Sequence, residues 1–270
     1  MWIMNKVSIY GNFEEILDHP VFAPVDCDLV IDYEIPAWLH KHPVKPNRLV
    51  IFATIQPEGQ FNDLIIAHQD KYDHLLTFIP QLLSLPKARF CIALTPFCTP
   101  DINIPKVFGV SAVFSGRNAC PGHSLRHELY RRRDEIKIPK WFYTGLRSGL
   151  RSALELPAEK SAKQRVMNTM FHIAIDSYDY ENSFSEKLID PLITNCYVIY
   201  WGCSNLYRYF NPDSIIRINT VSEIIDVCNS VTEETFRRCQ SGRLDNFLKA
   251  QEYIPYHVVI QKEIDKICAL

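Results

Sequence analysis

One segment, residues 171–211, constrains the fold of this chain more than any other. It begins with a short apolar run with β-branched side chains, residues 171–175, which is typical of a buried strand and stops at Asp176. A polar loop follows, and Ser185 is then suited to cap a helix. Residues 197–201 form a second apolar run. The segment therefore predicts a strand, loop, helix and strand, with polar side chains at the carboxyl end of the first strand, where open α/β sheets bind ligands.

The rest of the chain also alternates strands with short helices, which is typical of mostly parallel sheets. We predict further strands over residues 6–10, 28–32, 48–55, 74–79, 89–94, 107–114 and 215–219. We predict further helices over residues 63–69, 125–134 (capped by Ser124), 222–228, 233–249 and 256–267. This pattern indicates an α/β protein with two domains, residues 1–104 and residues 105–270, the second including the terminal helices.

Composition excludes several classes of protein. The apolar share of 47%, the charged share of 22% and the net charge of −2 are ordinary for a soluble globular protein and indicate no nucleic-acid partner. No apolar run approaches the length of a transmembrane segment, and the first ten residues lack the features of a secretory signal. Nine cysteines are scattered without a Cys-x-x-Cys pair, so we expect reduced thiols and a cytoplasmic protein. His123 and His127 lie four residues apart without an evident third ligand, and we predict no metal site.

A basic segment follows the strand predicted over residues 107–114. Residues 106–151 contain ten lysines and arginines and three acidic residues, a net charge of +7. Such a run is usually a solvated helix face. Here it begins where a strand leads into a helix, which is a common position for a phosphate site.

Three short sequences, in this order, resemble the donor-site signature of the α1,3-fucosyltransferases. They are Ser-Glu-Lys-Leu-Ile-Asp at 185–190, Val-Ile-Tyr-Trp-Gly at 198–202 and Phe-Asn-Pro-Asp-Ser at 210–214. The resemblance is to the soluble bacterial or viral members, and it is specific over residues 165–220. It implies two Rossmann-like domains facing a cleft, the GT-B arrangement, with a terminal helix that can return to the first domain. It also implies an inverting, metal-independent transfer of L-fucose from GDP-fucose to a glycan hydroxyl, with no cofactor besides the nucleotide sugar.

The resemblance also implies which residues bind the donor. Lys187 and Arg126 would neutralise the diphosphate, since Arg can bind two phosphate oxygens and Lys acts as a point charge. Glu186 would contact the ribose or the sugar. In the loop before them, the family's Glu-Asn pair and its aromatic residue are replaced by other side chains, and the donor-side candidates there are Asp176, Ser177, Asn182 and Ser183. Less certain matches to the family's arginine are Arg117 and residues 131–133.

The acceptor hydroxyl must lose a proton, which requires a general base within hydrogen-bond reach. The family carries a glutamate after a strand of the first domain, and this chain has Gln56 there. Because a glutamine cannot take up a proton, we predict that Glu58 is the catalytic base, with Asp63 and Asp70 as alternatives. Two other functions remain open. The chain could transfer another nucleotide sugar such as a UDP-pentose, or it could be a non-catalytic protein that binds nucleotide sugars or glycans.

Overall fold

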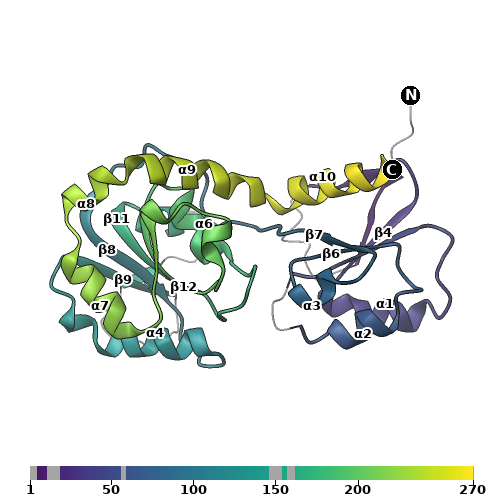
Figure 1. Ribbon diagram of the computed structural model, residues 1–270, viewed down its shortest axis with the longest axis horizontal. Coiled ribbons are helices and arrows are strands. Elements are labelled where there is room, and N and C mark those ends of the chain that lie inside the picture. The colour runs from purple at the N-terminus through teal and green to yellow at the C-terminus, as the bar shows by residue number, and fades with distance from the viewer. Residues whose placement is uncertain (1–4, 11–18, 56–58, 146–153, 157–161, 270) are drawn as a thin grey trace. The chain divides into compact units, whose positions relative to one another are not determined.

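The computed structural model describes residues 5–10, 19–55, 59–145, 154–156 and 162–269, and it divides into two compact units (Figure 1). The first unit comprises Met1–Thr95 and Tyr253–Leu270, and the second comprises Pro96–Glu252. Our sequence boundary between residues 104 and 105 therefore differs from the structure. Residues 96–104 belong with the second unit. The terminal helix belongs with the first unit, to which the family resemblance allowed it to return.

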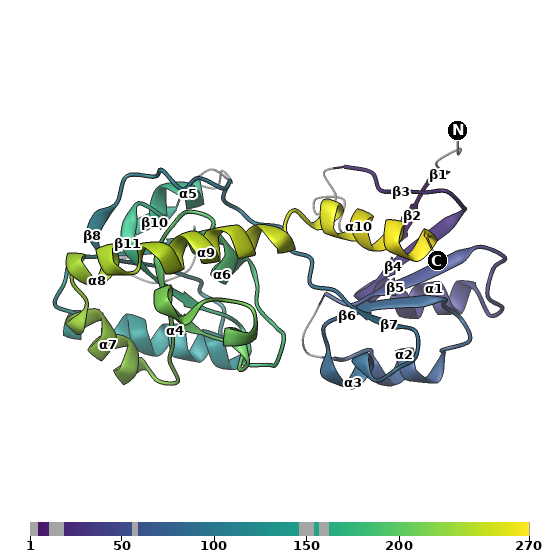
Figure 2. The same cartoon turned by 45° about the horizontal axis from the view of Figure 1, so that its top comes forward.

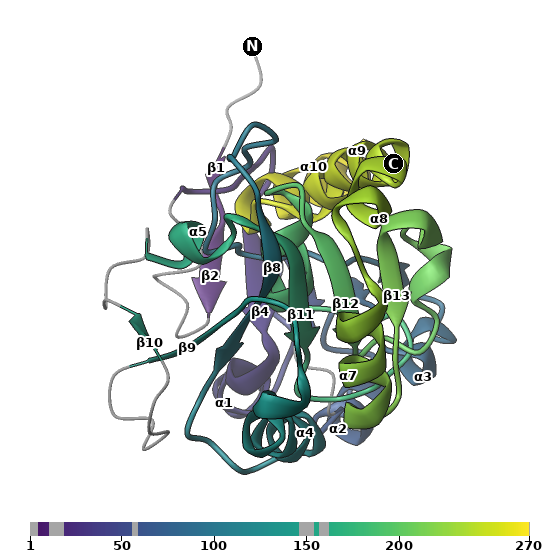
Figure 3. The same ribbon diagram turned by 90° about the vertical axis from the view of Figure 1, so that its left-hand side faces the viewer.

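The second unit contains a six-stranded parallel sheet. Its strands are β8 (Val107–Phe114), β9 (Lys140–Gly145), β10 (Leu154–Leu156), β11 (Thr169–Ile175), β12 (Tyr197–Trp201) and β13 (Ile215–Arg217). Their spatial order is β10-β9-β8-β11-β12-β13, and the labels of these strands follow one another in this order in Figure 3. This is the doubly wound order, in which the chain direction across the sheet reverses between β8 and β11. Ligands of such sheets bind at the carboxyl ends of the two strands at this switch point.

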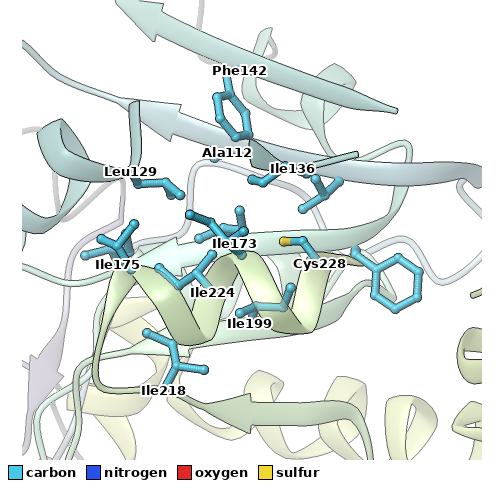
Figure 4. Close-up of a cluster of buried hydrophobic side chains, with 14 of the residues drawn as sticks. Ala112, Leu129, Ile136, Phe142, Ile173, Ile175, Ile199, Ile218, Ile224 and Cys228 are labelled. Carbon is cyan, nitrogen blue, oxygen red and sulfur yellow. The ribbon is translucent and has the colours of Figure 1, made fainter. Parts of the chain in front are cut away.

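Helices cover both faces of this sheet. They are α4 (Pro121–Arg131), α5 (Ala162–Val166), α6 (Glu186–Leu192), α7 (Val221–Ser230), α8 (Glu233–Arg238) and α9 (Gln240–Ala250). Because side chains alternate along a strand, β11 presents Phe171, Ile173 and Ile175 to a single face. These three pack with Leu129 of α4 and Ile224 of α7 in one buried cluster, much of which is drawn in Figure 4. Helix α6 contacts β11 and β12, and α9 packs on α6.

The first unit contains a five-stranded parallel sheet whose spatial order follows the chain order. Its strands are β2 (Ser8–Tyr10), β4 (Cys27–Ile31), β5 (Leu49–Ala53), β6 (His74–Thr77) and β7 (Ala88–Phe90). A short antiparallel pair joins β1 (Asn5–Lys6) to β3 (Phe22–Ala23). The helices are α1 (Ile35–Lys41), α2 (Asn62–Ala67), α3 (Pro80–Leu83) and α10 (Tyr256–Cys268).

The C-terminal helix α10 is part of the core of the first unit. Ile260 and Ile264 are fully buried in one cluster with Leu29 of β4 and Ile51 of β5. Gln261 donates to and accepts from the backbone of Phe22, with distances of 2.9 and 2.8 Å. Figure 2 shows α10 alongside the strands of this unit. Residues from the two ends of the chain therefore close one hydrophobic core.

Several elements differ from the sequence prediction. Helix α4 begins at Pro121, with Cys120 as its N-cap, and Ser124 lies inside it. A proline in the first turn loses no hydrogen bond and its backbone angle suits a helix, so the earlier start is physically reasonable. Pro36 plays the same part in α1, a helix that is absent from the sequence prediction. We also had not predicted β9 and β10, and the expected helix 233–249 is broken at Cys239.

Three general properties of the described part of the chain bear on function. No helix in it is long and apolar enough to cross a membrane. No group of three or more His, Cys, Asp or Glu side chains in it could hold a metal ion. All nine cysteines are free thiols, and six of them are buried.

Candidate functional site

The carboxyl end of β11 lies unusually close to the first turn of α4. The backbone N–H of Gly122 donates to the carbonyl oxygen of Ser177 at 3.0 Å. A Cβ atom at position 122 would lie only 1.7 Å from the carbonyl oxygen of Asp176, so only glycine permits this approach. The contact brings α4 to the switch point of the sheet, and Arg126 follows one helical turn later.

Arg126 is buried and incompletely compensated. Its side chain is 5% exposed, and its Nε–H donates to the carbonyl oxygen of Ile175 at 3.1 Å. Its Nη2 atom is buried and has no hydrogen-bond partner in the described structure. Burial lowers the pKa of Arg126, although the nearby carboxylates of Asp176 and Glu186 act in the opposite direction. Because a buried donor without a partner is costly, this guanidinium is suited to bind an anion.

A second cation lies at the start of α6. Ser185 is the N-cap, and its hydroxyl oxygen accepts from the backbone N–H of Lys187 at 3.2 Å. The Lys187 Nζ atom lies 2.8 Å from a carboxylate oxygen of Glu186. Burial alone would lower the pKa of Lys187, but the charges of Glu186 and Asp176 outweigh it and raise that pKa. Burial would raise the pKa of Glu186, but the charges of Lys187 and Lys163 bring it to about 2. Both groups are therefore charged at neutral pH.

Asp176 connects the strand end to this helix start. One carboxylate oxygen accepts from the Ser185 hydroxyl, and the other accepts from the Tyr200 hydroxyl at 2.5 Å. Burial raises the pKa of Asp176, and the charge of Lys187 counteracts this. A side chain at Gly202 (φ +154°) would collide with the Tyr200 hydroxyl oxygen, at 2.3 Å from its Cβ. Since both oxygens are occupied, the structure gives Asp176 a role in holding Ser185.

The loop between β11 and α6 is held by its own polar contacts. Asn182 has a φ of 58°, and its side-chain oxygen accepts from Asn205 at 2.7 Å and from the Tyr209 hydroxyl at 2.5 Å. The carbonyl oxygen of Ser177 accepts from the backbone N–H of Gly122 in α4. Ser183 is half-buried, and its backbone N–H lies 3.4 Å from the carbonyl oxygen of Tyr180. The side-chain contacts of Asn182 explain why this residue is polar without any ligand, whereas the contacts of Ser177 and Ser183 are made by their backbone. The contact of all three residues with a donor remains a prediction.

The basic segment contributes fewer residues to this site than its charge suggests. Arg132 donates to both carboxylate oxygens of Glu135 at 2.9 Å, and it also pairs with Glu128 at 3.3 Å. Arg133 stacks over the ring of Tyr130, with its guanidinium carbon 4.6 Å from the ring centre. This cluster is six residues beyond Arg126, roughly 9 Å further along the helix axis. The solvated-face interpretation therefore holds for residues 131–133.

Two residues near the two cations, His123 and Lys163, were not singled out for this site from sequence. Burial and the charges of Arg126, Arg117 and Lys187 lower the pKa of His123, so a neutral imidazole lies beside these cations. Arg117, which we had matched to the family's arginine with less certainty, is exposed.

Lys163 of α5 lies 3.2 Å from Asp190 and lines a small pocket that Lys187 also lines. The sequence around Lys163 matches no motif. Only the fold could reveal that it faces α6.

The predicted catalytic base cannot be placed. Gln56 and Glu58 lie outside the described residues. Asp63 is exposed in the first turn of α2. Asp70 is also exposed, and a hydrogen bond from Lys71 lowers its pKa, which is the opposite of what a base acting near neutral pH requires.

Asp32, which the sequence analysis missed, lies directly after β4. It is buried, has a φ of 29°, and accepts from the backbone N–H of Ile55 at 2.6 Å. A non-glycine residue with positive φ is strained, and such strain often marks functional regions. Here Asp32 fixes the backbone that leads directly into residues 56–58.

No protein-family model matches the chain, and no curated protein matches its sequence. Solved structures do resemble it. An α1,3-fucosyltransferase with GDP is 15% identical with a TM-score of 0.51, over 84% of this chain and 76% of that one. Anabaena HepE in complex with UDP-glucose is 10% identical with a TM-score of 0.62, over 90% and 78%. A UDP complex of Staphylococcus aureus TarM is 10% identical with a TM-score of 0.58, over 88% and 55%. The chain therefore has the GT-B glycosyltransferase fold, with two Rossmann-like domains.

Proposed function

We propose that this protein is a glycosyltransferase that binds a nucleoside diphosphate sugar in its second unit and transfers the sugar to a hydroxyl of a glycan. One observation carries the proposal. Arg126 is buried at the switch point of the sheet with an unpartnered Nη2 atom. In this fold an anionic ligand at that position supplies the missing partner.

The site is suited to a diphosphate leaving group. As the sugar departs, negative charge grows on the diphosphate, and fixed cations stabilise that charge most strongly in the transition state. Arg126 offers a planar pair of donors, and Lys187 offers a point charge. The contacts of Ser185 with Asp176 and with the backbone of Lys187 hold this second cation in place before any ligand binds.

Two nucleotide sugars are candidates for the donor. The sequence motifs at 185–190 and 198–202 favour GDP-fucose. The similar structures include an α1,3-fucosyltransferase with GDP-fucose and HepE with UDP-glucose, so a UDP-sugar has comparable support. Our order of preference is GDP-fucose first and a UDP-sugar second.

Glu58 is our candidate for the base that takes the proton from the acceptor. In the sequence Glu58 follows β5, and the backbone N–H of Ile55, which lies between them, donates to Asp32. The presence of Gln56 instead of a glutamate favours a second function, a non-catalytic protein that binds the same nucleotide sugar. Turnover separates the two, because only the transferase releases nucleoside diphosphate in the presence of an acceptor.

A binding experiment tests the shared first step. Melting temperatures and calorimetric affinities are measured with GDP, UDP, GDP-fucose and UDP-glucose, with and without EDTA. We expect at least one nucleotide to raise the melting temperature, because a ligand of the folded state stabilises it, and EDTA to leave the affinity unchanged. Arg126→Gln should weaken that ligand by about 10- to 100-fold, the scale of a charge-assisted hydrogen bond.

The matched control is Arg132→Gln. Arg132 lies just past the end of the same helix and is already paired with Glu128 and Glu135. It should leave nucleotide affinity unchanged. If no nucleotide shifts the melting temperature, or if both variants lose affinity equally, the proposed site is wrong.

A further inference from the structure

Two tyrosines in the loop after β11 form a stacked pair. The ring centres of Tyr178 and Tyr180 are 5.3 Å apart, and their planes differ by only 6°. Tyr178 is half-buried, whereas Tyr180 is 42% exposed. Large aromatic side chains usually bury their rings, so an exposed ring that continues a parallel stack is well placed to receive another flat ring.

The backbone that carries this pair is fixed on several sides. Between the tyrosines, Asp179 forms an ion pair of 2.5 Å with Arg217 at the end of β13. The carbonyl oxygen of Tyr180 lies 3.4 Å from the backbone N–H groups of Ser183 and Ser204. A platform that is already ordered loses little conformational entropy when a ligand binds, which favours affinity.

The platform is also close to the anion site. Tyr178 follows Ser177, whose carbonyl oxygen accepts from Gly122 in the first turn of α4, and Arg126 lies one turn further on. Ser177 and Tyr180 are three residues apart, so the chain between them spans at most about 11 Å. A ligand with a diphosphate at Arg126 and a flat ring that reaches Tyr180 fits this arrangement.

We infer that Tyr180, supported by Tyr178, is the stacking surface for the base of the nucleotide. This rests on the proposed function, because it requires a nucleoside diphosphate at Arg126. Stacking on an aromatic ring tolerates different bases, since every base has a π-face. The pair therefore supplies affinity for the nucleoside and leaves the choice between guanine and uracil to other contacts.

The experiment compares a ligand that has a base with one that lacks it. Affinities of GDP, UDP and inorganic pyrophosphate are measured by calorimetry for the natural chain, Tyr180→Ala, Tyr180→Leu and Tyr180→Phe. We expect Ala and Leu to weaken the bound nucleotide by about tenfold, equivalent to ~1.4 kcal/mol, and Phe to retain its affinity. Pyrophosphate affinity should not change in any variant. The absorbance of the base should fall on binding to the natural chain and fall less with Tyr180→Ala.

The control is Tyr33→Ala in the first unit, where Tyr33 is 52% exposed and also contacts an aromatic ring, Phe61. It should leave all three affinities unchanged. The inference is overturned if Tyr180→Ala binds the nucleotide normally, or if pyrophosphate is weakened as much as the nucleotide. If the natural chain binds neither nucleotide nor pyrophosphate, the proposed function itself fails. If it binds pyrophosphate as tightly as GDP and UDP, only the base site is refuted.

Discussion

The two cations of the candidate site, Lys187 and Arg126, differ in how many of their N–H donors have a partner. Lys187 has three N–H donors and directs two of them to Glu186 and to the Ser185 hydroxyl. Arg126 has one hydrogen bond to the backbone and an Nη2 atom without a partner in the described structure. An incoming anion therefore fills an empty position at Arg126, whereas at Lys187 it must share the ammonium with Glu186.

The first prediction concerns Lys187→Ala. It should weaken the binding of the active nucleotide by roughly 1.5–3 kcal/mol, because a charge-assisted hydrogen bond is lost. Calorimetry at fixed ionic strength measures the change. Lys249→Ala is the control, because Lys249 on α9 pairs with the nearby Asp245 at 2.9 Å and is partly exposed. Equal affinity of the Lys187 variant and the natural chain would exclude Lys187 from the site.

The second prediction concerns pH. The folded-state pKa of Glu186 is about 2, against an ordinary value of 4.5, because Lys187 and Lys163 outweigh the effect of burial. A depressed carboxyl pKa stabilises the folded state above pH 4.5, and the stabilisation is lost as the pH falls from 4.5 to 2. Between pH 4.5 and pH 2, the free energy of unfolding should therefore fall by about 1–3 kcal/mol more in the natural chain than in Glu186→Gln. Urea unfolding at several pH values measures it. Glu233→Gln, at the exposed start of α8, should keep the natural slope, and an unchanged slope in Glu186→Gln would contradict the pairing.

At the scale of elements, the helix α6 depends on its N-cap residue in two ways. Ser185 caps the helix through Lys187, and its hydroxyl also donates to Asp176 at the end of β11. The third prediction is that Ser185→Ala lowers the free energy of unfolding by about 1 kcal/mol and also weakens nucleotide binding.

Helix α7 provides the matched control for this change. Thr220 caps it in the same way, by accepting from the backbone N–H of Glu223 at 3.2 Å. Thr220→Ala should show a similar loss of stability with unchanged nucleotide affinity. If both variants bind the nucleotide equally well, the cap of α6 only stabilises the fold.

The unit from β11 to β12 could be predicted closely from sequence, because its signals are local. The apolar run with β-branched side chains, the polar loop and the Ser185 cap each depend on residues a few positions apart, and the structure confirms the strands and the helix. The start of α4 was placed too late because Ser124 was preferred over Pro121 as a start signal. The role of Arg126 could be suspected, but its missing partner could not. That property depends on the hydrogen bond to Ile175, which is distant in sequence, and on the close packing of α4 on β11 that Gly122 allows.

At the scale of the whole chain, the same distinction holds. The doubly wound order of the second sheet requires knowing that β11 pairs with β8, a pairing across about sixty residues that no local pattern specifies. Likewise, the amphipathic pattern of residues 256–267 predicts a helix but not the sheet that it covers. The structure places Ile260 and Ile264 against β4 and β5. The first unit therefore needs two separate stretches of the chain, whereas the second unit is continuous.

The fourth prediction follows from this division. Residues 96–252 contain a complete sheet, its core and the candidate anion site, so this fragment should fold alone. We expect it to unfold cooperatively on heating and to bind the active nucleotide within about threefold of the affinity of the whole chain.

Residues 1–95 alone lack α10 and leave the apolar face around Leu29 and Ile51 uncovered, so they should bind hydrophobic dyes and unfold without a cooperative transition. Joining residues 253–270 to them through a flexible linker should restore the transition and abolish dye binding. Changing Ile264 to Asp in that joined chain should remove the rescue, since it puts a charge into the buried contact. A cooperative fold of residues 1–95 alone, or a fragment 96–252 that folds but binds no nucleotide while the whole chain does, would contradict this assignment of core and site to the two units.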